Sequence, residues 1–271
     1  MPRYGMVVDV TRCDGCYNCF IACKDEYCEQ AKPGYSAAQP MTGQDWMKIL
    51  PKERGQFPKV KQDYTAVPCM QCENPGCMAG STGEVYKRAD GIVMVDPDKA
   101  KGKPELVNKC PYRRIYWNEN EQVGQKCTFC AHLLDKGWKE PRCVEACPTG
   151  TLIFGDLDDP NSAVSQAWKK AEAMHPEYKL GDKVRYIGLP KAFIAGSVAY
   201  RDKDECAVGA TVTLKGDAGT LTTKTDAFGD FEFEGLPENA TYKLQVSAPG
   251  YAAKELTVKT SMSINLGDIL L

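Results

Sequence analysis

The sequence predicts an α+β fold in two parts, a cysteine-rich body followed by a small antiparallel β-sandwich. Thirteen of the fourteen cysteines lie between Cys13 and Cys147, and most are two or three residues from another cysteine. Cysteine nearly vanishes from about Phe193 onward. There, short alternating apolar and polar runs are separated by turn residues, which is typical of antiparallel strands.

Composition and charge exclude several classes of protein. The chain is long enough for one large domain or two ordinary ones. It has 34 Lys and Arg against 36 Asp and Glu, without a basic block, so we expect no nucleic-acid partner. No apolar run is long enough to span a bilayer. The N-terminus MPRYGMVVDV lacks the pattern of an export signal, which favours a cytoplasmic location.

The first cysteine motif, CDGCYNCFIAC, has the spacing of a bacterial motif for a cubane iron–sulfur cluster. In this motif the first three thiolates bind one cluster, and the fourth completes a different cluster. A proline usually follows the fourth cysteine, but here Lys24 does. The four cysteines are Cys13, Cys16, Cys19 and Cys23.

A degenerate copy of this motif ends at the isolated Cys110. When Val8–Cys23 is aligned with Val95–Cys110, valine matches valine, aspartate matches aspartate, and Gly15 matches Gly102. Cys110 is therefore the fourth cysteine of a motif whose first three have been replaced. The replacing residues are Ala100, Lys103 and Leu106.

The other cysteines form two further copies, CMQCENPGCMAGS and the pair CTFC with CVEACP. Cys147 comes four residues after Cys143, and Ser81 comes four residues after Cys77. Ser81 therefore stands at a fourth-ligand position that has also lost its thiol.

Because the fourth cysteine of each motif completes the partner motif's cluster, twelve cysteines form three sets of four. All four replaced positions then belong to one further, vacated site. We predict three [4Fe–4S] clusters, held by Cys13, Cys16, Cys19 and Cys147 (set 1), by Cys23, Cys127, Cys130 and Cys143 (set 2), and by Cys69, Cys72, Cys77 and Cys110 (set 3).

Structural zinc is the alternative, because C-x2-C pairs also make tetrahedral zinc sites. Zinc sites usually use two such pairs, and not a run of three with a distant fourth, so clusters are favoured. Cys28 and Cys206 are left over and are expected to be free thiols. His132 is interpreted as a packing or surface residue, and no catalytic residue is predicted in this chain.

The predicted organisation follows the motifs. Residues 1–155 form the cluster-binding body, in which two ferredoxin-like units are interleaved: the first motif pairs with the last, and the inner two pair together. Strands are expected at YGMVVDV, GIVMVD and GTLIFGD. An insertion at about 28–64, with a strand candidate at DWMKIL, is either a surface excursion or a docking surface. Residues 156–190 form a connector with one amphipathic helix, capped by Asp156, Asp158 or Asp159.

Residues 191–271 form the predicted β-sandwich. The stretch TKTDAFGDFEFEGLPENATYKLQVSAPGYAAKELTV resembles transthyretin-like or carboxypeptidase-regulatory immunoglobulin-like domains. Such domains are usually accessory, so we interpret this one as a packing or interface module.

Residues 1–155, on these motifs, resemble the iron–sulfur subunits of molybdopterin-dependent oxidoreductases of the dimethyl-sulfoxide reductase superfamily. Typical members have four clusters, whereas this chain lacks the ligands of one and adds a β-sandwich. The resemblance implies an electron-transfer subunit paired with a large catalytic subunit, which binds molybdenum through two guanine-dinucleotide pterins. It also leaves export open, together with a partner that carries a twin-arginine signal.

Two alternatives remain at this stage. In one, the chain delivers electrons to a related molybdenum reductase or dehydroxylase. In the other, it is a stand-alone polyferredoxin whose β-sandwich is an adhesive module.

Overall fold

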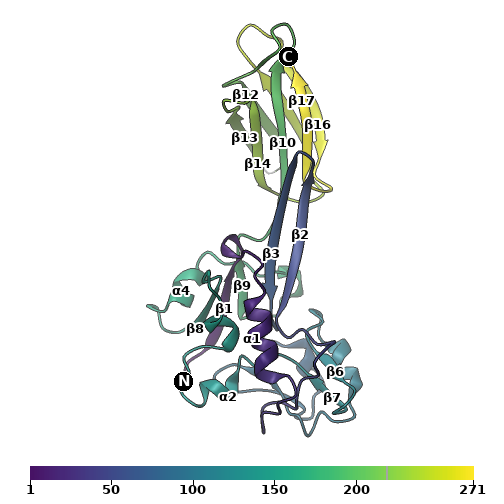
Figure 1. The fold of residues 1–271 in the computed structure, drawn as a ribbon, viewed down its shortest axis with the longest axis vertical. Coiled ribbons are helices and arrows are strands. Elements are labelled where there is room, and N and C mark those ends of the chain that lie inside the picture. The colour runs from purple at the N-terminus through teal and green to yellow at the C-terminus, as the bar shows by residue number, and fades with distance from the viewer. Residues whose placement is uncertain (218) are drawn as a thin grey trace. The chain divides into compact units, whose positions relative to one another are not determined.

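The computed structural model describes residues 1–217 and 219–271, which form two compact units. Unit 1 comprises Met1–Pro51 and Tyr64–Leu189, and unit 2 comprises Lys52–Asp63 and Pro190–Leu271. None of the helices in these described ranges is long and apolar enough to cross a membrane. Figure 1 shows the elements of both units.

Unit 1 is organised by a three-stranded sheet in the order β8-β1-β9 (Figure 1). Strand β1 is antiparallel to β8 and parallel to β9, and Val8 pairs with both Leu152 and Tyr186. The β1 side chains from Met6 to Val8 are fully buried, as expected for a central apolar strand. The strands are β1 (Tyr4–Asp9), β8 (Leu152–Asp156) and β9 (Val184–Ile187).

This sheet brings together the two ends of the cysteine-rich body. Strand β1 leads directly into the first motif, and β8 follows directly after Cys147. Strand β9 comes from the segment that the sequence suggested as a connector, and Tyr186 on it is fully buried. Residues 156–189 are thus part of unit 1, and β9 contributes to its core.

The helices of unit 1 are short, and two of them, α1 and α3, contain motif cysteines. They are α1 (Asn18–Tyr27), α2 (Ala131–Leu134), α3 (Arg142–Glu145) and α4 (Ala163–Trp168). Helix α1 presents Cys19, Cys23 and Tyr27 on one buried face, because residues four apart lie above one another on a helix. The predicted acidic cap of α4 is wrong: the Ser162 side chain accepts a hydrogen bond from Ser165 N at 3.1 Å. This helix is also shorter than its apolar spacing suggested, because the chain leaves the helix and Glu172 forms an isolated β-bridge with Tyr186.

The second half of unit 1 is built from two small hairpins and short 3-10 helices. Its core contains Val85, Val93, Ile115 and Val123. The hairpins are β4 (Val85–Lys87) with β5 (Val93–Val95) and β6 (Tyr116–Asn118) with β7 (Val123–Gln125). The 3-10 helices of the whole unit are Val10–Arg12, Gly76–Met78, Pro104–Lys109 and Pro176–Tyr178. The strands expected at YGMVVDV, GIVMVD and GTLIFGD are confirmed as β1, β5 and β8.

The insertion forms a hairpin of β2 (Lys48–Gln56) and β3 (Lys59–Val67), which is longer than the strand candidate DWMKIL. Its base belongs to unit 1, where Ile49 and Ala66 are buried. Its tip belongs to unit 2: Gln56 Oε1 accepts a hydrogen bond from Asn265 N at 2.9 Å, and Lys59 lies 3.2 Å from Glu232. The insertion is therefore a packed structural element.

Unit 2 contains a β-sandwich with its own apolar core, which includes Val212, Phe231, Phe233 and Leu244. One sheet has the order β11-β10-β14 with β17 also paired to β10, and the other has the order β13-β12-β15-β16. The strands are β10 (Ala192–Tyr200), β11 (Glu205–Cys206), β12 (Thr211–Gly216), β13 (Gly219–Lys224), β14 (Asp230–Leu236), β15 (Thr241–Ser247), β16 (Lys254–Lys259) and β17 (Ile264–Leu270).

One pairing in the sandwich differs from the antiparallel prediction. Strand β17 runs parallel to β10, with Ile194 beside Ile264 and Ala199 beside Leu270. A parallel neighbour requires a crossover connection. Here the chain crosses from β16 in one sheet to β17 in the other sheet. The last strand, β17, therefore lies beside β10 and runs in the same direction as β10.

Candidate iron–sulfur sites

The cysteine loops share one backbone feature. The residue before the second cysteine has a left-handed conformation in each intact motif: Gly15 (φ 73°), Gln71 (φ 47°) and Phe129 (φ 51°). Gly102 (φ 69°) has it too, at the matching position of the degenerate motif. A left-handed residue in such a loop turns successive N–H groups to one side, which favours binding of an anionic group. All four motifs therefore keep a related loop geometry.

Gly15 is required for a second reason. A Cβ atom at this position would lie 2.6 Å from the Tyr64 ring, which is closer than real contacts allow. Tyr64 belongs to β3 at the base of the insertion hairpin. The first loop can therefore close against the hairpin only with glycine at this position.

The four cysteines of set 1 line one cavity. Cys13 and Cys16 come from the loop after β1, Cys19 from α1, and Cys147 from the loop before β8. Ile49 and Ala66 from the hairpin base complete the wall. The pairing of β1 with β8 thus brings a cysteine more than a hundred residues distant in sequence to the first motif.

The four cysteines of set 3 line a second cavity. Its wall also includes Val93, Pro111, Tyr112 and the buried Lys126. Arg114 N donates a hydrogen bond to Cys110 Sγ at 3.4 Å. Backbone donors of this kind stabilise a thiolate over a thiol.

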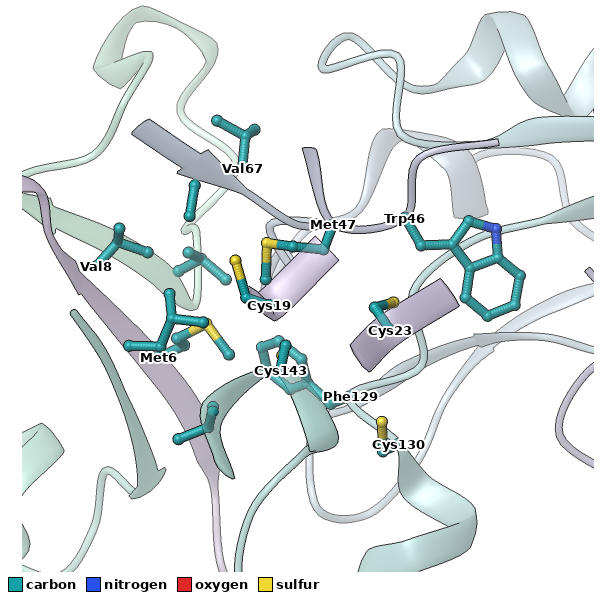
Figure 2. Close-up of a cluster of buried hydrophobic side chains, with 14 of the residues drawn as sticks. Met6, Val8, Cys19, Cys23, Trp46, Met47, Val67, Phe129, Cys130 and Cys143 are labelled. Atoms are coloured by element: carbon teal, nitrogen blue, oxygen red, sulfur yellow. The ribbon is translucent and has the colours of Figure 1, made fainter. Parts of the chain in front are cut away.

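The cysteines of set 2 lie within the main apolar core of unit 1. Figure 2 shows Cys23, Cys130 and Cys143 arriving from α1, α2 and α3 around Phe129. Burial raises the pKa of Cys127 to about 12, and the nearby Cys130 adds to the rise. Burial, together with Cys130, Cys23 and Cys127, raises the pKa of Cys143 well above its usual value.

This burial tests whether the residues suit an iron–sulfur group. An isolated buried thiolate is unfavourable, and a metal removes that cost because a coordinating thiol is deprotonated outright. Cys147 differs, since its pKa is lowered by hydrogen bonds from Thr149, Thr151 and Leu152 although burial opposes them. Grouped buried thiols with backbone donors are the donor set that cubane clusters use.

A single zinc ion would need four sulfurs about 2.3 Å from one point. In residues 1–217 and 219–271, no three His, Cys, Asp or Glu side chains converge so as to hold one ion.

Set 2 is close to both other sets. Cys19 of set 1 is close enough to Cys143 of set 2 to contribute to the raised pKa of Cys143. Cys69 of set 3 is the second contributor, after burial, to the raised pKa of Cys127 in set 2. Set 2 therefore has a neighbour in each of the other two sets.

The vacated site is filled by packing and by one ion pair. Ala100 and Leu106 are fully buried in an apolar cluster with Val85 and Val123. Lys103 lies 3.1 Å from the buried Glu84. The Ser81 hydroxyl accepts hydrogen bonds from the backbone N–H groups of residues 83 and 85.

Several polar residues that contact the cysteines could not be predicted from the cysteine spacing. The Asp182 carboxylate accepts a hydrogen bond from Cys72 Sγ at 3.5 Å and from the Tyr112 hydroxyl at 2.5 Å. The Tyr27 hydroxyl lies 2.8 Å from Thr128 Oγ1. It also hydrogen-bonds Cys130. This bond favours the Cys130 thiolate and lowers the pKa of Cys130, whereas the larger effect of burial raises it. These residues are far apart in sequence, so only the fold brings them together.

The remaining candidates are not among the predicted cluster ligands. His132 is buried, and its Nε2 atom lies 2.9 Å from Glu26 Oε1. Cys206 is exposed on β11, and Cys28 is the half-buried C-cap of α1. Neither cysteine lines the set 1 or set 3 cavity.

The interleaved cysteine motifs and the body that carries them define an iron–sulfur electron-transfer protein. A family model described as a 4Fe-4S dicluster domain matches residues 60–157. A carboxypeptidase regulatory-like domain matches residues 194–267 of the sandwich.

Full-length comparison specifies the family. The pyrogallol hydroxytransferase small subunit of Pelobacter acidigallici is 39% identical over 100% of both chains. A tetrathionate reductase subunit of Salmonella typhimurium is 34% identical over 71% of this chain and 75% of its own length. The arsenate respiratory reductase iron-sulfur subunit of a Shewanella strain is 31% identical over 68% of this chain and 96% of its own. The chain belongs to the iron–sulfur subunits of the dimethyl-sulfoxide reductase superfamily, the family that the motifs indicated, and it is an electron-transfer subunit.

Proposed function

We propose that this chain holds three [4Fe–4S] clusters, on sets 1, 2 and 3, and connects them to a molybdenum site on a large partner subunit. The molybdenum would be bound by two guanine-dinucleotide pterins. The partner would act on polyhydroxylated aromatics and convert pyrogallol to phloroglucinol. Full-length similarity to the pyrogallol hydroxytransferase small subunit supports this substrate class.

The observation that carries the proposal is the composition of the two cavities. Each contains all four cysteines of one predicted set and none from another. The four positions of the vacated site are instead occupied by two apolar residues, an ion-paired lysine and a hydrogen-bonded serine. Three sites and one loss therefore account for the twelve motif cysteines.

When bound, clusters of this type carry single electrons, at potentials set by charge, hydrogen bonds and solvent exposure. The residues of this chain would hold the clusters in the order set 1, set 2, set 3. The apolar side chains around set 2 exclude water, while Cys16 of set 1 is exposed. Set 1 is thus the more accessible end for exchange with a partner.

The test is anaerobic purification of the native complex through a tag on this chain, with iron and molybdenum measured together. We expect a large co-purifying subunit, molybdenum, about twelve iron atoms on this chain, and conversion of pyrogallol. A Cys13→Ser complex should lose activation by reductant. Iron without molybdenum or partner would instead establish a stand-alone carrier.

Electron delivery to a reductase is the second candidate, because the tetrathionate and arsenate reductase subunits are also relatives. The same purified complex separates the two. Reduction of a single substrate with an artificial electron donor would favour the reductase. Turnover of pyrogallol without consumption of an electron donor would favour the transhydroxylase.

A further inference from the structure

Lys126 is a buried lysine without a carboxylate partner in the described part of the chain. It is 2% exposed. Its Nζ donates hydrogen bonds to two backbone carbonyl oxygens, those of Val93 and, at 3.0 Å, of Cys127. Lysine is almost never fully buried unless it is paired. Carbonyl oxygens satisfy its donors, but they do not neutralise its charge.

The other buried lysine of unit 1 shows the usual solution. Lys183 is 3% exposed, and its Nζ lies 2.7 Å from Glu73 Oε2. Lys126 therefore needs an anion that is not a protein carboxylate.

The position of Lys126 identifies that anion. Lys126 lines the cavity that contains Cys69, Cys72, Cys77 and Cys110. Its charge favours the thiolates there, since it lowers the pKa of Cys77 and of Cys110 against the larger effect of burial. It acts on Cys127 of set 2 in the same direction.

We propose that Lys126 is a tuning residue that supplies the counter-charge of the set 3 cluster and raises its reduction potential. This inference rests on the proposed function, because it requires a cluster on set 3. A cubane with four thiolates is a net anion, and reduction adds one more negative charge. A fixed cation beside it in a low-dielectric site stabilises the reduced form.

The test is an EPR-monitored redox titration of the full complex with Lys126→Met and Lys126→Arg. The set 3 signal is identified as the one altered by Cys77→Ser. In Lys126→Met we expect the reduction equilibrium of set 3 to weaken at least tenfold, which is about 59 mV for one electron. Lys126→Arg keeps the charge and should stay within about threefold of wild type.

Lys24→Met is the matched control. Lys24 Nζ also binds two carbonyl oxygens, those of Pro40 at 2.8 Å and Gln44 at 3.0 Å. It lies on α1 beside Cys23 of set 2 and does not line the set 3 cavity. The set 3 potential should therefore not change.

The outcomes separate the inference from the proposed function. Wild-type complex with iron for only two clusters on this chain would contradict the ligand assignment itself. Full iron with an unchanged set 3 potential in Lys126→Met would overturn the role of Lys126. If Lys126→Met loses iron, full iron in Lys126→Arg supports the charge requirement, and equal loss in Lys126→Arg contradicts it.

Discussion

Lys103 forms an ion pair of 3.1 Å with Glu84 at the position where the matching motif carries its second cysteine. Glu84 is buried, and its Oε2 atom also accepts hydrogen bonds from the Thr82 backbone and hydroxyl. Leu106, at the place of the third cysteine, is fully buried. The vacated site has thus become a hydrophobic core with a polar edge.

Leu106→Ala should therefore destabilise the protein without removing iron. Truncation of a fully buried leucine costs about 2–5 kcal/mol, from lost transfer energy and from the cavity left behind. Denaturant unfolding measures the free energy, and iron analysis of the folded variant should give the wild-type content. Leu221→Ala, on an exposed residue, is the control and should stay within about 0.5 kcal/mol. Loss of iron in Leu106→Ala would contradict this expectation, because it would show that packing in the vacated site is needed to keep a neighbouring cluster.

Cys110→Ala should remove one cluster, about four iron atoms per chain. Cys110 lines the set 3 cavity although no other cysteine lies near it in sequence. Cys28→Ala is the matched control, because Cys28 is also half-buried but is predicted to be a free thiol. Iron analysis compares the two variants. Equal iron in both, or loss in Cys28→Ala, would contradict the assignment of the sets.

The cysteine motifs could be read from spacing alone, and their grouping into three ligand sets stays a prediction. Swapping the fourth ligand between paired motifs is a property of the repeat, and the apolar runs beside the motifs predict β1, β5 and β8. Gly15 and Gly102, which align in the two motifs, both have a left-handed backbone. Local sequence determines these features.

Features that depend on long-range contact could not be predicted. The exposed, charged residues of β2 and β3 have little strand signal, and the hairpin is defined by contacts of its base and of its tip. Nothing in the residues around Lys126 indicates that it is buried, because its environment comes from Val93 and from the set 3 loops. The acidic cap predicted for α4 failed because Ser162, closer to the helix, provides the hydrogen bond.

Asp135→Asn should weaken the attachment of the β4–β5 hairpin to α2. Both Asp135 oxygens accept hydrogen bonds from Arg88, at 2.8 and 2.6 Å, and the Tyr35 hydroxyl adds a third at 2.7 Å. For a bidentate pair that is partly exposed we expect a loss of about 1 kcal/mol. The thermal midpoint of Asp135→Asn should therefore fall, and that of Asp158→Asn, on a more exposed pair, should fall less.

The stability difference between wild type and Asp135→Asn should depend on pH in a defined direction. Hydrogen bonds from Arg88 lower the pKa of Asp135 from 3.8 to about 2. A depressed carboxyl pKa contributes stability above the unfolded value, and that contribution is lost as the pH falls through the folded value. The difference in stability between wild type and Asp135→Asn should be constant from about pH 8 to 5. It should shrink as the pH falls from 3.8 toward 2. A gap that widens in acid would contradict the ion pair.

Removal of iron should unfold unit 1 and leave the β-sandwich of unit 2 folded. Cys19, Cys23, Cys130 and Cys143 are part of the main core of unit 1, so loss of the clusters would leave buried polar groups and empty space in that core. The core of unit 2 has no cysteine among its buried residues. Limited proteolysis after treatment with an iron chelator should therefore degrade unit 1 and leave a resistant fragment that contains Pro190–Leu271. The untreated complex, digested in parallel, is the control. Survival of an intact chain without iron would show that packing alone holds unit 1 together, and the clusters would then have no structural role.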